Sequence, residues 1–115
     1  MALTAKTRQE GNVSIVDLNG KITLGESSGV LRDELNSLLA MGRKSIIVNM
    51  ANVSYVDSAG LGELTVVYTF ASKRSCPLRL VGAPPNLRKI LEMTRLEDLF
   101  HPVDSVTIAK RQMRQ

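Results

Sequence analysis

The sequence predicts a single α/β domain built around one mixed β-sheet. Short apolar segments that suit buried strands alternate with longer segments in which apolar residues recur every three or four positions, as on one face of a helix. This alternation is typical of a sheet whose neighbouring strands run parallel and are joined by helical crossovers. The 115 residues are 43% hydrophobic and 23% charged, which suits one domain with one core over residues 1–115.

The chain begins with a predicted β-hairpin. Residues 3–8 alternate weakly and suit an edge strand, and Glu10-Gly11-Asn12 is typical of a hairpin turn. In the next strand, residues 13–20, apolar side chains occupy both parities, so we expect both faces to be covered for part of its length. Residues 20–25 are expected to form a connecting loop.

A helix and a buried strand are predicted next. Apolar residues spaced by three and four predict a helix over residues 26–41, and Gly42 suits its end because glycine readily adopts the left-handed conformation. Residues 45–50 are almost continuously apolar, as expected for a strand buried on both faces. We expect Ala51-Asn52 to end this strand.

The second half of the chain continues the strand–helix order. A helical pattern from Leu61 to about Lys73 cannot continue through Pro77. Residues 78–81 suit a strand, and Pro84-Pro85 suits the first turn of a third helix, where a missing N–H does no harm.

The remaining residues are predicted to pack over the hydrophobic core and to form a C-terminal tail. We expect residues 96–100 to cover the core, residues 102–103 to start an edge segment, and Asp104 to cap a short helix. Residues from about 110 to 115 are expected to form a flexible basic tail. Three methionines are expected to fill the core: Met41, Met50 and Met93.

Composition argues against several classes of function. The net charge is +4, but the basic residues are scattered, whereas nucleic-acid binding usually needs a basic stripe on one face. One cysteine, Cys76, and one histidine, His101, predict neither a disulfide nor a metal site. No leader and no apolar run of about 20 residues is visible, so we expect a cytoplasmic protein without a membrane span.

Chemistry-bearing residues concentrate in the segment Asp57-Ser58-Ala59-Gly60-Leu61-Gly62, between the buried strand and the second helix. In α/β sheets, binding sites form outside the carboxyl ends of strands. Asp57 or Ser58 suits the N-cap of the helix. Gly60 and Gly62 would let another protein surface approach the backbone closely, although a simple cap and turn would also explain the segment.

An enzymatic role for Ser58 has little support. A serine nucleophile needs a base and an orienting carboxylate, and His101 is the one candidate base. Ser58 does not lie in a Gly-x-Ser-x-Gly elbow, and no Gly-Lys-Ser/Thr of a phosphate-binding loop follows the glycines. We therefore expect no catalysis and no cofactor.

The ordered motifs resemble those of the STAS domain family, most closely its stand-alone bacterial anti-sigma factor antagonists. The resemblance covers nearly the whole chain and includes the segments 18–22, 46–50, 56–62, 78–82 and 87–96. It implies a four- to five-stranded sheet with helices packed mainly on one face.

The resemblance also implies partner switching, with Ser58 as the phosphoacceptor. The unphosphorylated chain would bind an anti-sigma factor that is itself a serine kinase, of the histidine-kinase-like ATPase fold, and so release a sigma factor. Phosphorylation of Ser58 would end that binding, and a PP2C-type phosphatase would reverse it. ATP would belong to the kinase.

Several neighbours of Ser58 are candidate partner contacts, and other functions stay open. Antagonists of this type often carry an acidic residue where this chain has Thr23. Thr23 could therefore contact the partner, serve as a second phosphoacceptor, or be a solvated loop residue. The full candidate set is Thr23, Ser27, Asp57, Ser58, Ala59, Gly60, Gly62 and Glu63. The alternatives are a non-switching STAS subunit, as a stressosome scaffold or a partner of a lipid-transport ATPase, and, more remotely, a small serine hydrolase.

Overall fold

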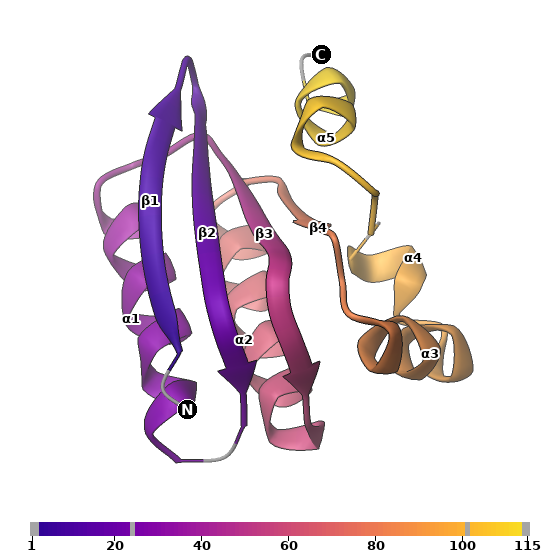
Figure 1. Ribbon diagram of the computed structural model, residues 1–115. Helices are drawn as coiled ribbons and strands as arrows, with labels where there is room; N and C mark the ends of the chain where they lie inside the picture. Colours follow the sequence, from indigo (N-terminus) through magenta and orange to yellow (C-terminus); the bar gives the residue numbers. More distant parts are fainter. Residues whose placement is uncertain (1–2, 24, 101, 114–115) are drawn as a thin grey trace.

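Four strands form one mixed sheet in the order β1-β2-β3-β4 (Figure 1). The computed structural model describes residues 3–23, 25–100 and 102–113, and for residues 26–28 it describes the backbone alone. β1 runs antiparallel to β2, and β2, β3 and β4 are parallel neighbours, which confirms the predicted mixed α/β sheet. The strands are β1 (Thr4–Glu10), β2 (Val13–Ile22), β3 (Ser45–Val56) and β4 (Leu78–Val81).

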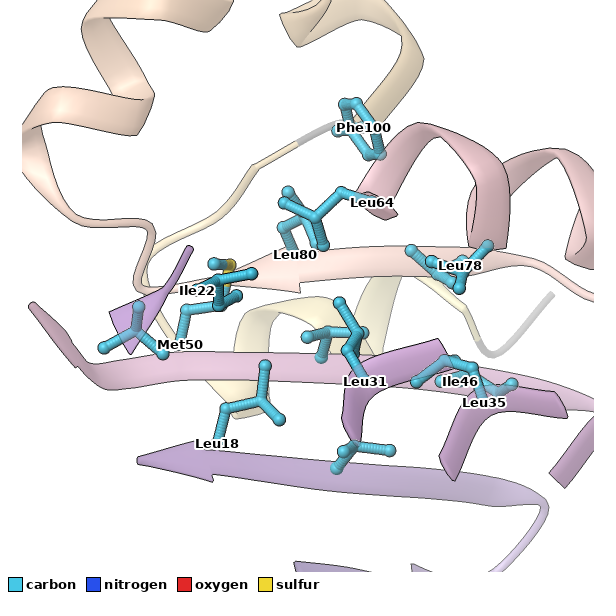
Figure 2. Packing of buried hydrophobic residues seen from close by; sticks show 14 of the residues in the cluster. Leu18, Ile22, Leu31, Leu35, Ile46, Met50, Leu64, Leu78, Leu80 and Phe100 are labelled. Carbon is cyan, nitrogen blue, oxygen red and sulfur yellow. The ribbon is translucent and has the colours of Figure 1, made fainter. Parts of the chain in front are cut away.

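Two long helices lie together on one face of the sheet (Figure 1). The helices are α1 (Glu26–Ala40), α2 (Ser58–Lys73), α3 (Pro85–Thr94), α4 (Glu97–Phe100) and α5 (Val106–Gln112). Figure 2 shows side chains from the strands and from α1 and α2 packed against each other in this layer, among them Leu18, Leu31 and Leu64. Phe100 of α4 is also fully buried there, and its ring meets that of Tyr68 edge-on at a centroid distance of 5.5 Å.

The opposite face of the sheet has a smaller apolar layer under α5. Ile15 of β2, Ile47 of β3 and Val81 of β4 are buried there with Ala109 of α5. Adjacent residues such as Ile15 and Val16 therefore point to different cores, because successive side chains of a strand alternate between faces. This confirms the prediction that the second strand is covered on both sides for part of its length.

The end of α1 follows the expected glycine chemistry. Gly42 has a φ of 74°, and its N–H donates to Leu39 O at 3.0 Å, while the N–H of Arg43 donates to Leu38 O at 3.1 Å. These two bonds form the Schellman motif, which satisfies carbonyls that the helix end would otherwise leave without partners.

The two central strands are longer than the sequence predicted. β2 continues to Ile22, and β3 runs through Ala51-Asn52 to Val56 instead of ending there. The expected break appears as two irregularities of the β2–β3 register, beside Asp17/Asn19 and Gly20/Lys21. Bulges of this kind interrupt the side-chain alternation without ending a strand.

The C-terminal part of the chain differs from the prediction in detail. Ser105 caps α5, accepting from Ile108 N at 3.2 Å, so Asp104 is not the cap. Val103 forms a parallel bridge with Val81, which places the expected edge segment beside β4. Residues 110–112 are helical, and Lys110 Nζ lies 2.6 Å from Glu10 Oε1, so this part of the expected tail is folded.

The three methionines have different surroundings, although all were expected in the core. Met50 is fully buried, whereas Met41 and Met93 are 63% and 75% exposed. Met41 caps the exposed end of α1, and Met93 lies on the solvent side of α3.

Among the described residues, no helix is long and apolar enough to cross a membrane.

Candidate functional site

The segment 57–62 begins α2 at the carboxyl end of β3. Asp57 is the N-cap: its Oδ1 accepts from Gly60 N at 2.8 Å, and its carbonyl accepts from Leu61 N at 2.9 Å. The N–H of Asp57 donates to Ile22 O at 3.1 Å, so the cap is also tied to the end of β2. Of the two cap candidates that the sequence offered, Asp57 takes the role and leaves Ser58 as the first helical residue.

Ser58 is exposed at the N-terminus of α2. The backbone N–H groups of a helix's first turn have no intrahelical acceptor, and the helix dipole places partial positive charge there. Asp57 satisfies one of these groups, that of Gly60. The remaining N–H groups and the dipole make the position of Ser58 favourable for an added anion.

Gly60 is buried, and its missing side chain is required inside the domain. A Cβ atom at this position would lie 2.5 Å from Ile22 O, 2.9 Å from Ile22 Cγ2 and 2.9 Å from Val56 Cγ1. The first of these neighbours is a backbone oxygen that already accepts from Asp57 N, so it cannot move away freely. Gly60 therefore allows α2 to pack against the strand ends, which differs from the expectation that it receives a partner.

Gly62 faces open space. Among the described residues, and apart from its two chain neighbours and the local helix backbone, no atom lies within 4 Å of a Cβ built at this position, and the residue is exposed. Glycine in a helix costs roughly 0.5–1 kcal/mol relative to alanine. Since no contact with a described residue requires Gly62 to be glycine, the surface beside Ser58 is the place where its small size would matter.

Glu63 is engaged within the chain. Its carboxylate receives two hydrogen bonds from the guanidinium of Arg32 in α1, one of them from Nε at 3.1 Å. The Glu63 side chain is only 12% exposed, whereas that of Arg32 is 45% exposed. The sequence suggested either a solvated carboxylate or a contact with a basic partner residue, and the structure instead links α1 to α2.

The other candidate residues lie near the same strand ends. Thr23 directly follows β2 and is half-buried, and Ala59 is half-buried in the first turn of α2. The structure brings these residues together with Asp57 through the contact between Ile22 and Asp57. Ser27 belongs to α1, and its side chain lies outside the described residues.

Asn86 is a neighbour of this site that the sequence did not reveal. From the first turn of α3 its side-chain Nδ2 donates to Val56 O at 2.6 Å, and its Oδ1 accepts from Val56 N at 3.4 Å. The sequence signal was weak, because an asparagine after Pro84-Pro85 looks like an ordinary residue at a helix start. Only the path of the chain after β4 brings it to the end of β3.

Three observations bear on other kinds of chemistry near Ser58. Within the described part of the chain, no group of three or more His, Cys, Asp or Glu residues could hold a metal ion. His101, the one candidate base for a serine nucleophile, lies outside the described residues. A groove of about 550 Å³ lies at the other end of the sheet, where Gly11, Val13 and Ser45 line it, so it does not adjoin Ser58.

Comparison with known proteins gives a consistent family. The sequence model of the STAS domain matches residues 4–109. A STAS-domain containing protein of Pseudomonas aeruginosa is 28% identical over 100 residues, which are 87% of this chain and 97% of that protein. The anti-sigma-B factor antagonist of Staphylococcus aureus is 32% identical over 71 residues, which are 62% of this chain and 66% of that protein.

Solved structures share the fold. The anti-sigma factor antagonist of Mycobacterium paratuberculosis superposes with a TM-score of 0.87 at 20% identity, covering 98% of this chain and 95% of that one. The phosphorylated form of the Bacillus cell fate determinant SpoIIAA superposes with a TM-score of 0.75 at 17% identity, covering 96% of this chain and all (100%) of that one. At these identities the likeness shows the fold, and the four-stranded mixed sheet agrees with the predicted sheet of four to five strands.

Proposed function

Because the chain belongs to the STAS domain family, we propose that it is an anti-sigma factor antagonist that works by partner switching at Ser58. With Ser58 unphosphorylated, the chain binds an anti-sigma factor that is itself a serine kinase. That binding releases a sigma factor. Phosphorylation of Ser58 by the kinase ends the complex, and a PP2C-type phosphatase restores it. The chain itself catalyses no step, and ATP is bound by the kinase.

The observation that carries this proposal is the exposure of Ser58 as the first residue of α2, beside the open surface at Gly62. A kinase must reach the hydroxyl, and an exposed residue at the start of a helix is reachable. The relative from Staphylococcus aureus, which is named an anti-sigma-B factor antagonist, supports the same partner class.

The physics of the phosphate favours control of the interface. Phosphorylation adds about 1.5–2 negative charges and three acceptor oxygens at pH 7. A partner packed closely over Gly62 would have to bury that charge, and an unpaired charge inside an interface costs about 2–5 kcal/mol of affinity. Such a loss lowers the affinity by roughly 30-fold to several thousand-fold.

The proposed partner surface surrounds Ser58 on three elements. Thr23 and Ser27 contribute from the β2–α1 connection and the start of α1, and Asp57, Ser58, Ala59 and Gly62 contribute from the start of α2. Gly60 lies beneath this surface and allows α2 to pack against the strand ends, and Glu63 binds Arg32 and so links α2 to α1. Thr23 stands where related antagonists often carry an acid, so it contributes to the choice of partner.

Binding measurements with two substitutions at Ser58 test the proposal. Ser58→Ala should bind the host's histidine-kinase-like anti-sigma factor as the wild type does but resist phosphorylation, and Ser58→Asp should bind it at least 30-fold more weakly. Ser37→Asp is a matched control, because Ser37 is exposed near the other end of α1 and receives the same charge. Mass spectrometry of the protein from its own host should find phosphate on Ser58. Equal affinity of Ser58→Asp and the wild type for every such kinase of the host would refute the proposal.

A further inference from the structure

Asn86 holds the last residue of β3 by both of its backbone polar groups. Its Nδ2 donates to Val56 O at 2.6 Å, and its Oδ1 accepts the longer bond from Val56 N at 3.4 Å. One side-chain amide therefore makes the two bonds that a neighbouring strand would make to this residue. The two residues are 30 positions apart in the sequence.

This contact lies where β3 has no strand neighbour on its β4 side, although it still pairs with β2 there. β4 pairs only with residues 46–49 of β3, so the second half of β3 extends beyond it. Gly82, with a φ of 66°, turns the chain across β3 so closely that a Cβ there would lie 3.0 Å from Ala51 Cα. The connection from β4 to α3 thus follows the edge of β3 that β4 leaves unpaired. At the end of that edge, the side chain of Asn86 bonds to Val56.

Capping of α3 does not account for Asn86. Pro84 occupies the N-cap position, no side chain caps this helix, and the amides of Leu87 and Arg88 both donate to Pro84 O at 3.0 Å. The Asn86 side chain points instead to the strand whose next two residues are Asp57 and Ser58.

The turn that carries Ser58 is consequently held from two sides. On one side, Ile22 O of β2 accepts from Asp57 N at 3.1 Å, and the same oxygen would lie 2.5 Å from a Cβ atom at Gly60. On the other side, Asn86 of α3 fixes the peptide groups of Val56. Neither restraint uses the Ser58 side chain, so both can persist while its hydroxyl is modified.

We propose that Asn86 is a positioning residue for Ser58: it fixes the end of β3 so that the first turn of α2 presents the hydroxyl in one geometry to the kinase. Presentation of Ser58 to a kinase rests on the proposed function. The restraint on residues 56–60 does not, since it concerns only the conformational freedom of the turn. Loss of the amide should let this turn open locally while the rest of the domain stays folded.

Amide hydrogen exchange on the full chain tests the positioning directly. Asn86→Ala should accelerate exchange of the Asp57 and Gly60 amides about tenfold or more, because each lost hydrogen bond changes a local equilibrium by roughly 2- to 12-fold. Neither amide bonds to Asn86, so their acceleration would report loosening of the turn and not merely the missing contact. The amides of Ile47 and Leu91 should keep their wild-type rates.

Two further variants keep the result interpretable. Thr94→Ala removes a hydrogen bond to Ile90 O at the other end of α3 and should leave Asp57 and Gly60 unaffected. Asn86→Asp keeps an acceptor for Val56 N but loses the donor and faces the Val56 carbonyl with a negative charge, so it should accelerate the same amides. Unchanged exchange of Asp57 and Gly60 in both Asn86 variants, each shown to be folded, would overturn the inference.

Phosphorylation separates this inference from the proposed function. With the host's serine kinase and ATP, Asn86→Ala should incorporate phosphate into Ser58 at least several-fold more slowly than the wild type and Thr94→Ala. If the wild type itself accepts no phosphate, the proposed function fails, and the exchange data still decide the positioning role. If the wild type is phosphorylated and Asn86→Ala matches it in both rate and exchange, only the present inference fails.

Discussion

Gly60 and Gly62 lie two residues apart in one helix, yet the structure predicts opposite effects for the same substitution. At Gly60, an alanine Cβ would lie 2.5 Å from Ile22 O and 2.9 Å from Val56 Cγ1, which is closer than carbon atoms normally approach. At Gly62, the same atom would have no neighbour within 4 Å in the part of the structure that is described, apart from the adjacent residues and the local helix backbone. Substituting each glycine by alanine therefore distinguishes the effect of internal packing on stability from the effect of helix propensity.

The expected magnitudes follow from those two terms. Overpacking a well-packed core typically costs about 1–3 kcal/mol, and replacing a helical glycine by alanine returns roughly 0.5–1 kcal/mol. For Gly60→Ala the difference is a net loss of about 0–2.5 kcal/mol, with a midpoint of about 1 kcal/mol, in the free energy of unfolding. For Gly62→Ala only the propensity term applies, so we expect a gain of about 0.5–1 kcal/mol.

Urea unfolding of both variants and the wild type, followed by circular dichroism, measures these differences. A lower midpoint at an unchanged slope is expected for Gly60→Ala, and a higher midpoint for Gly62→Ala. If Gly60→Ala is as stable as the wild type, the close contact with Ile22 is not a constraint. If both substitutions destabilise equally, the assignment of Gly62 to an open surface is wrong.

Three further predictions concern the cap, the pH dependence and the thiol. Asp57→Ala should lower the free energy of unfolding by about 0.5–2 kcal/mol, measured in urea, and Asp57→Ser should recover most of it, because the lost bond is that to Gly60 N. Burial raises the pKa of Asp17, but hydrogen bonds from Arg8 and Asn49 outweigh it and hold the pKa below its ordinary value of 3.8. The resulting stabilisation is present above that value and is lost as the pH falls through the folded-state pKa, so Asp17→Asn should flatten the acid limb of a pH–stability curve. Cys76 is 5% exposed and burial raises its pKa, so alkylation at pH 8 should be much slower than in urea; equal rates would contradict its burial.

The sequence was informative wherever a local rule was sufficient. Parity in residues 13–20 predicted two covered faces, and Gly42 predicted the end of α1, because both signals depend on the backbone geometry of a few adjacent residues. The segment 57–62 was likewise predicted to start a helix at the end of a buried strand, with Asp57 as one of the two possible caps.

The failures concern contacts between distant parts of the chain. The sequence around the two glycines did not distinguish Gly60 from Gly62, since the closest contact at Gly60 is with Ile22, which lies nearly 40 residues earlier. Glu63 was predicted to be solvated or to meet a basic residue of a partner protein, because its partner within the chain, Arg32, belongs to another helix. The same reason hid Asn86, whose partner is one residue at the end of a strand that the pattern predicted to be shorter.

These long-range contacts explain why a phosphate at Ser58 would act on binding rather than on folding. The turn is fixed by the Asp57 cap, by Gly60 against Ile22 and by Asn86, and none of these uses the Ser58 hydroxyl. An added anion at the first position of α2 meets N–H groups and the positive end of the helix dipole, an interaction that stabilises a helix by about 0.3–1 kcal/mol. On the proposed function, the several kcal/mol of unfavourable free energy would therefore fall mainly on the partner that has to cover the charge. A phosphatase could then reset the proposed switch without refolding of the domain.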